Sequence, residues 1–155
     1  MALPAEFVRE YVEGFAQVLA DDPDLGLTWR DADPYDPAEV GIWLAAFPTA
    51  AEFDQSSAVA LTPYGYGDDP AMNDSELGLQ IKVRRPGPDP RPCWALDDAI
   101  GNVLLGMYPV TLPTGVQVIT LQRTSSVSLG MDENQRWTWS SNYGTTVYRP
   151  SAHRV

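Results

Sequence analysis

Residues 123–150 read RTSSVSLGMDENQRWTWSSNYGTTVYRP. In the second half of this stretch, Trp137, Trp139, Ser141, Tyr143, Thr145 and Val147 recur at every second position. Alternation of this kind, with aromatic and β-branched side chains on one side, is typical of a half-buried strand. The stretch therefore predicts the end of one strand, then a polar loop from Ser126 to Gln135, and then a long strand from about Arg136 to Arg149. We expect Trp137, Trp139 and Tyr143 to contribute to the core.

The clearest alternation elsewhere in the chain is in residues 77–85. Apolar side chains at Leu77, Leu79, Ile81 and Val83 alternate with polar ones, which predicts a strand with one face on the core. Further strands are predicted at residues 26–29, 58–64 and 115–124, and an acidic turn at residues 64–74. In residues 115–124 the apolar positions shift from even to odd numbers between Val118 and Ile119, which indicates either a bulge or burial on both faces.

Two amphipathic helices are predicted, over residues 4–20 and after the proline-rich residues 86–92. Residues 38–47 are compatible with a capped helix or a buried strand, and we favour the strand. The order of elements indicates a single α+β domain over residues 1–155. It would have a mostly antiparallel sheet of four to five strands with both helices packed on one face.

The charge is strongly acidic and unevenly distributed. The net charge is −11, and residues 1–55 hold twelve Asp and Glu residues against Arg9 and Arg30. Such a charge argues against tight binding to nucleic-acid phosphates or to anionic membranes. It fits a solvated surface, or one that faces DNA without retaining it.

Features that would indicate a secreted, membrane or redox protein are not evident. Cys93 is the only cysteine, so an intrachain disulfide is impossible. We expect Cys93 to pack as a small apolar residue. The first residues have neither the basic nor the apolar region of a signal peptide. No apolar run approaches the length that spans a bilayer. We expect no cofactor.

Candidate catalytic groups are sparse. His153 is the only histidine and stands near the end of the chain, where a nucleophile–histidine device would lack support. The densest acidic cluster is Asp68, Asp69, Asp74 and Glu76, which we expect to form an exposed loop. An oxygen-ligand metal site there is a remote alternative, because the spacing does not match an EF-hand loop.

The remaining candidates are surface groups in the second half of the chain, where arginines gather. A domain with separate acidic and basic parts can pair one part with a neighbouring copy, and such contacts can close into a ring. We therefore expect contacts to a neighbouring subunit or another protein at Arg84, Arg85, Arg123, Ser126, Leu129, Met131, Asp132, Glu133, Arg136 and Arg149.

Several segments carry a resemblance to a known family. They are residues 58–64 (AVALTPY), the Asp68-Asp69-Pro70 turn, residues 77–86 (LGLQIKVRRP), the Asp97-Asp98-Ala99 helix and residues 129–136 (LGMDENQR). Together they resemble the tail terminator or minor capsid proteins of long-tailed, non-contractile phages, particularly those of actinobacteria. The resemblance covers about residues 55–155.

This resemblance implies a structural virion protein without catalytic residues. It implies a homo-hexameric ring, assembled in the host cytoplasm and placed at the head–tail junction. The ring would cap the tail tube protein, stop tube polymerisation and join the head–tail connector protein, while DNA passes through without specific binding. The acidic loop is a candidate for the lumen. Alternatives are a head-completion or stopper subunit, an acidic metal-binding module or hydrolase, and a DNA mimic.

Overall fold

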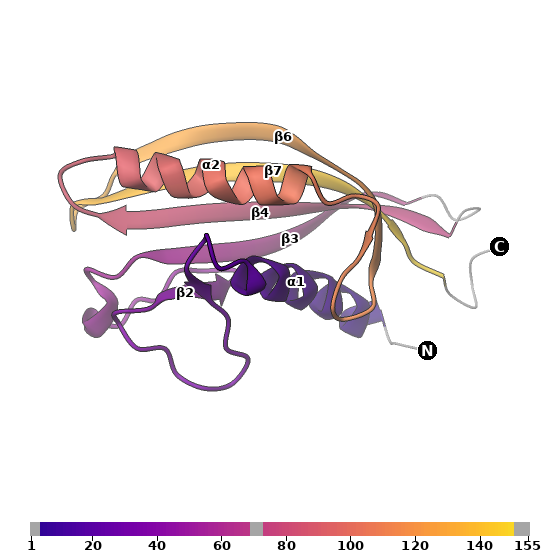
Figure 1. The fold of residues 1–155 in the computed structure, drawn as a ribbon, viewed down its shortest axis with the longest axis horizontal. Coiled ribbons are helices and arrows are strands. Elements are labelled where there is room, and N and C mark those ends of the chain that lie inside the picture. The colour runs from indigo at the N-terminus through magenta and orange to yellow at the C-terminus, as the bar shows by residue number, and fades with distance from the viewer. Residues whose placement is uncertain (1–3, 69–72, 151–155) are drawn as a thin grey trace.

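A computed structural model describes residues 4–68 and 73–150. It contains two α-helices, one short 3-10 helix and seven strands (Figure 1). The helices are α1 (Pro4–Asp21), η1 (Ala51–Phe53) and α2 (Arg91–Leu105). The strands are β1 (Leu27–Thr28), β2 (Val40–Leu44), β3 (Ala58–Asp68), β4 (Asp74–Pro86), β5 (Val110–Thr111), β6 (Gln117–Met131) and β7 (Arg136–Tyr148).

All seven strands form one sheet in the order β1-β2-β3-β4-β7-β6-β5. Strands β1, β2 and β3 are parallel to one another. The remaining neighbours in the sheet, β3-β4, β4-β7, β7-β6 and β6-β5, pair antiparallel. The prediction of an α+β domain is confirmed. The prediction of a sheet of four to five mostly antiparallel strands is wrong, because the sheet is larger and mixed. β1 lies within the strand predicted at residues 26–29, whereas β5, with two residues, is too short to produce a periodic signal in the sequence.

Both helices pack on the same face of the sheet, as expected. Tyr11 of α1 bonds to Thr145, and Asp97 of α2 bonds to Ser141. Thr145 and Ser141 are four residues apart on β7, so their side chains point to the same side. Figure 1 shows α2 lying along β7 and β4, while α1 lies beside β3 and β2. We call the side covered by helices the helix face and the other side the open face.

The core lies between this face and the helices. Its largest fully buried side chains include Tyr11, Phe15, Leu79, Ile81 and Tyr143. The alternation predicted for residues 77–85 is confirmed in β4. Tyr143 is a core residue as expected, whereas Trp137 and Trp139 are partly buried and pack against the core from its edge.

Strand boundaries differ from expectation at two turns. The polar loop predicted from Ser126 to Gln135 is wrong, because β6 continues to Met131 and only Asp132–Gln135 form the turn. Likewise, β3 runs on to Asp68, inside the predicted acidic turn. The predicted slip between Val118 and Ile119 is a β-bulge, and the strand interpretation of residues 38–47 is confirmed by β2.

Candidate assembly surface

The β6–β7 hairpin ends in a turn organised by Asp132. One carboxylate oxygen, Oδ1, accepts the backbone N–H groups of Asn134 and Arg136, both at 3.0 Å. The other, Oδ2, pairs with Arg136 Nε at 2.8 Å. Burial alone would raise the pKa of Asp132, but the hydrogen bonds from Arg136 outweigh it and hold the pKa below its usual value. Asp132 and Arg136 therefore act within this turn, whereas Glu133 beside them is exposed.

Three apolar side chains are exposed near this turn. Val127 is 53% exposed, Leu129 54% and Met131 43%. The strand that carries them is bulged three times, at Ile119, Thr124 and Leu129, and each bulge restarts the alternation between faces. Val127 pairs with Ser140 and so lies on the open face, while Met131 pairs with Trp137 on the helix face. Sequence reasoning selected Leu129 and Met131 but missed Val127, although it is a β-branched residue within an uncharged run.

Ser126 begins a chain of side-chain hydrogen bonds across the sheet into α2. Its hydroxyl accepts the indole N–H of Trp139 at 2.6 Å and lies 2.9 Å from the hydroxyl of Ser141. The hydroxyl of Ser141 in turn donates to Asp97 Oδ1 at 2.8 Å. Only 4% of Asp97 is exposed, and desolvation raises its pKa despite the bond from Ser141. These contacts tie β6, β7 and α2 together.

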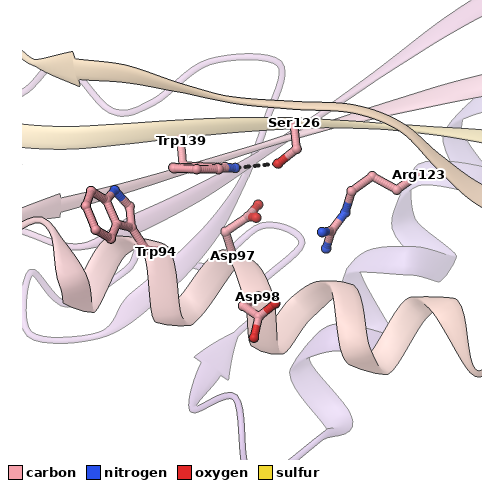
Figure 2. A pocket seen from close by; sticks show the side chains of 6 residues that line it. All are labelled: Trp94, Asp97, Asp98, Arg123, Ser126 and Trp139. Carbon is pink, nitrogen blue, oxygen red and sulfur yellow. Dashed lines mark hydrogen bonds between the residues drawn. The ribbon is translucent and has the colours of Figure 1, made fainter.

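A pocket of about 350 Å³ opens beside this chain, between α2 and the hairpin (Figure 2). Its lining is Trp94, Asp97, Asp98, Arg123, Ser126 and Trp139. Trp94 and Trp139 meet edge to face with ring centroids 6.2 Å apart. Figure 2 shows Trp94 and the two aspartates projecting from α2, with Arg123 approaching from the strand side. Trp94, Asp97 and Asp98 are additions to the residues expected from the sequence.

Arg123 spans the gap between β6 and α2. Its Nη2 donates to the hydroxyl of Tyr143 at 3.2 Å, and its guanidinium lies 5.6 Å from the centroid of that ring. The Nε atom is buried and has no hydrogen-bond partner among the described residues. The side chain of Arg123 therefore makes a contact within the chain, with Tyr143.

The other expected arginines divide into two places. Arg84 and Arg136 come together on the open face, where Arg84 donates to the carbonyl of Phe53 at 3.4 Å and Arg136 to that of Asp54 at 3.5 Å. Arg84 is 4% exposed, lies under the ring of Phe47, and has a pKa lowered chiefly by burial.

Arg85 and Arg149 contact other parts of the chain. The side chain of Arg85 donates to the hydroxyl of Ser57 at 3.3 Å. Arg149 lies over the ring of Phe7 at 4.7 Å. The structure therefore does not gather the expected arginines into one patch.

The acidic candidates lie at the end of the β3–β4 hairpin. Asp69 is outside the described residues, and only the backbone of Asp68 is described. Asp74 and Glu76 lie on β4, where Glu76 is exposed. Within residues 4–68 and 73–150, no three His, Cys, Asp or Glu side chains are grouped so that they could hold a metal ion. No helix in the same ranges is long and apolar enough to cross a membrane.

The fold is that of a small α+β protein. Its β6–β7 hairpin carries exposed apolar side chains that are suited to contacts with other proteins. Residues 19–149 match the sequence model of a family described as bacteriophage tail terminator protein. The chain belongs to this family. It is a structural protein of the virion tail that associates with other virion proteins.

A solved structure supports the fold. A chain from the virion of a native gene transfer agent particle is 15% identical, with a TM-score of 0.60. The match covers 86% of this chain and 90% of that chain. Another solved chain is 14% identical, with a TM-score of 0.45 over 97% of this chain and 100% of its own length. No curated protein matches.

Proposed function

We propose that the protein forms a hexameric ring that caps the tail tube. The ring stops polymerisation of the tube protein, joins the tail to the head connector and lets DNA pass through its lumen. The observation that carries this proposal is the family match over residues 19–149. The role is structural and not catalytic, in keeping with that family.

The exposed hairpin supports the proposal because it offers an apolar surface, at one end of the molecule, that can contact a neighbouring subunit of the ring or the tube. Val127, Leu129 and Met131 stand out from a sheet whose other large apolar side chains are mostly buried. Each subunit needs only a modest contact with the tube end, because a ring presents the contact several times and multivalent binding is strong. Growth stops when the outer face of the ring lacks the polymerising surface of the tube.

The charge supports the passage of DNA. The net charge of −11 opposes retention of phosphates by counterion release. The acidic end of the β3–β4 hairpin, with Asp74 and the exposed Glu76, is our candidate for the lumen surface. Asp68 and Asp69 continue the same acidic segment in the sequence.

Electron microscopy of tail tubes mixed with the purified protein tests the proposal. We expect rings at one end of each tube, and shorter tubes when the protein is present during polymerisation. A variant with Leu129→Asp should cap fewer ends, because it places a charge in the exposed apolar surface. Asn102→Asp, at an exposed position on α2, is the matched control. Decoration along the tube walls, or tubes of unchanged length without caps, would contradict the proposal.

A further inference from the structure

The sheet has a long free edge along β6. Strand β5 pairs only with Gln117 and Val118, so on the side of β6 away from β7 no described strand lies beside Thr120 to Met131. From Thr124 to Met131 the sequence is TSSVSLGM, without a charged residue or a proline. Natural sheet edges are usually protected by charges or proline, because an unprotected edge pairs with another strand. This edge is therefore suited to receive a strand.

A second free edge lies on the opposite side of the sheet, in β3. Strand β2 ends at Leu44, which pairs with Leu61, whereas β3 continues from Thr62 to Asp68 with no described strand on its outer side. Pro63 lies in this stretch, and proline within sheets is confined largely to edge strands. The end of β2 thus leaves a notch beside β3, with Leu44 exposed at its border.

The two edges run in opposite directions. Strands β3, β4, β7 and β6 are antiparallel in turn, so β6 is antiparallel to β3 within one molecule. When a second copy stands beside the first in the same orientation, its β3 is therefore antiparallel to β6 of the first. Antiparallel pairing satisfies the backbone groups of both edges except at Pro63, which has no N–H and leaves one acceptor of the incoming strand without a donor.

We infer that copies of this chain associate head to tail, with residues 124–131 of β6 pairing against residues 62–68 of β3 in the next copy. The two free stretches are similar in length and lie toward opposite ends of the sheet, so pairing them shifts neighbouring copies along the strand direction. Closed sheets have a stagger of this kind. In this arrangement the hairpin tip, with Leu129 and Met131, abuts the notch bordered by Leu44 of the next copy. The contact is heterologous, and in the proposed ring the rotation from one copy to the next closes after a full turn, so that all copies point the same way.

This contact deepens the proposed function, because it names the surface that would close the ring. It also places the helix face of every copy on the same side of the ring wall, since the joined sheet is continuous. A self-pairing of two β6 edges is the competing arrangement. It would be isologous and would give a closed dimer with the two copies in opposite orientations.

Cross-linking of the full-length chain distinguishes these arrangements. We would mix Ser128→Cys protein with Gly65→Cys protein and add a flexible bismaleimide. Both sites are exposed, and a β-carbon at Gly65 has no neighbour within 4 Å. The inference predicts mixed dimers between the two variants. Predominant Ser128→Cys homodimers would overturn it, and so would the absence of cross-links beyond those of an Asn102→Cys and Gly65→Cys mixture.

A charge placed on the edge gives a second test by light scattering. Val127→Lys should shift the protein from a closed oligomer to the monomer, whereas Asn102→Lys, with the same added charge on α2, should not. Circular dichroism confirms that both variants are folded. A wild-type chain that stays monomeric at every concentration, or a Val127→Lys variant that keeps its oligomer, overturns the inference.

The proposed function is judged separately, by microscopy of tubes. Caps that persist in the Val127→Lys variant would leave the tube-capping role intact and remove the β6–β3 contact. Mixed Ser128→Cys and Gly65→Cys dimers from a protein that never caps tubes would support the β6–β3 contact and contradict the tube-capping role.

Discussion

The guanidinium of Arg123 occupies the space that a β-carbon on Gly101 would need. A β-carbon at Gly101 would clash with Arg123 Nη2 and would lie 3.3 Å from the hydroxyl of Tyr143. Gly101 is buried in α2, where glycine costs about 1 kcal/mol relative to alanine. The absence of a side chain there lets the guanidinium of Arg123 lie against α2 while it bonds to Tyr143, its partner residue on β7.

A double-mutant cycle tests this relationship. Gly101→Ala should displace Arg123, and the lost hydrogen bond should roughly cancel the gain in helix propensity. Tyr143→Phe should cost about 1 kcal/mol of unfolding free energy in the wild type and close to nothing beside Gly101→Ala. Denaturant unfolding measures both values. Gly106→Ala, at the end of α2, is the control and should leave the cost of Tyr143→Phe unchanged; additive effects of Gly101→Ala and Tyr143→Phe would refute the relationship.

Asp97 makes stability depend on pH in a defined direction. Desolvation raises its folded pKa, so the folded chain binds a proton more readily than the unfolded chain at this site. Its stabilising contribution is complete below the ordinary carboxyl pKa and is lost as the pH rises through the raised value.

Asp97→Asn removes this dependence and keeps an oxygen that can accept from Ser141. We expect the variant to be more stable than the wild type at neutral pH, with the difference shrinking as the pH falls through the acid range. Thermal unfolding of both proteins across pH measures it. Glu133→Gln, at an exposed position in the β6–β7 turn, is the control. A stability difference that does not change with pH would show that Asp97 is not the responsible group.

Asp132 should hold the hairpin turn through its hydrogen bonds. Asp132→Ala removes acceptors for two backbone N–H groups and the ion pair with Arg136, which should cost about 1–2 kcal/mol. Hydrogen exchange should rise most at Asn134 and Arg136, and little in β4. Glu133→Ala removes an exposed carboxylate from the same turn and should change neither quantity. Equal effects of the two substitutions would contradict this role.

Tyr11 anchors α1 to the sheet through a directional pair of bonds. The hydroxyl of Thr145 donates its single hydrogen to the carbonyl of Leu77 at 2.8 Å, so Tyr11 must donate to Thr145 at 2.7 Å. Tyr11→Phe removes one bond and should cost about 1 kcal/mol, whereas Thr145→Val removes both and should cost more. Chemical denaturation of the two variants gives the order. The reverse order would refute the assigned donors.

Sequence periodicity located the elements whose pattern is regular. Helix α1 and strand β4 keep one period throughout, because each has one face on the core and one outside. The sequence pattern predicted only the first half of strand β6. Its bulges after Val118, Arg123 and Ser128 interrupt the period of two, so the uncharged second half resembled a loop.

The surface was harder to predict than the core, because exposure is a property of the folded chain. Arg84 and Arg123 look like surface charges in the sequence, yet one lies under Phe47 and the other reaches Tyr143 across the gap at Gly101. The free edge of β6 depends on β5 pairing with only two of its residues. Neither property has a local signature in the sequence.

Cys93 should report unfolding of the whole domain. Its thiol is 1% exposed, and burial raises its pKa to about 11, so little thiolate is present at neutral pH. Thiolate is the reactive form. A disulfide reagent should therefore label the native protein very slowly at neutral pH and label it at once in denaturant.

The labelling rate should rise in proportion to the unfolded population when destabilising substitutions such as Thr145→Val are introduced. Asn102→Cys, at an exposed position on α2, supplies a matched fast control in the folded protein. Labelling of Cys93 at a rate close to that of this exposed cysteine would show that α2 opens locally from β4 and β7, which would contradict its place in the core.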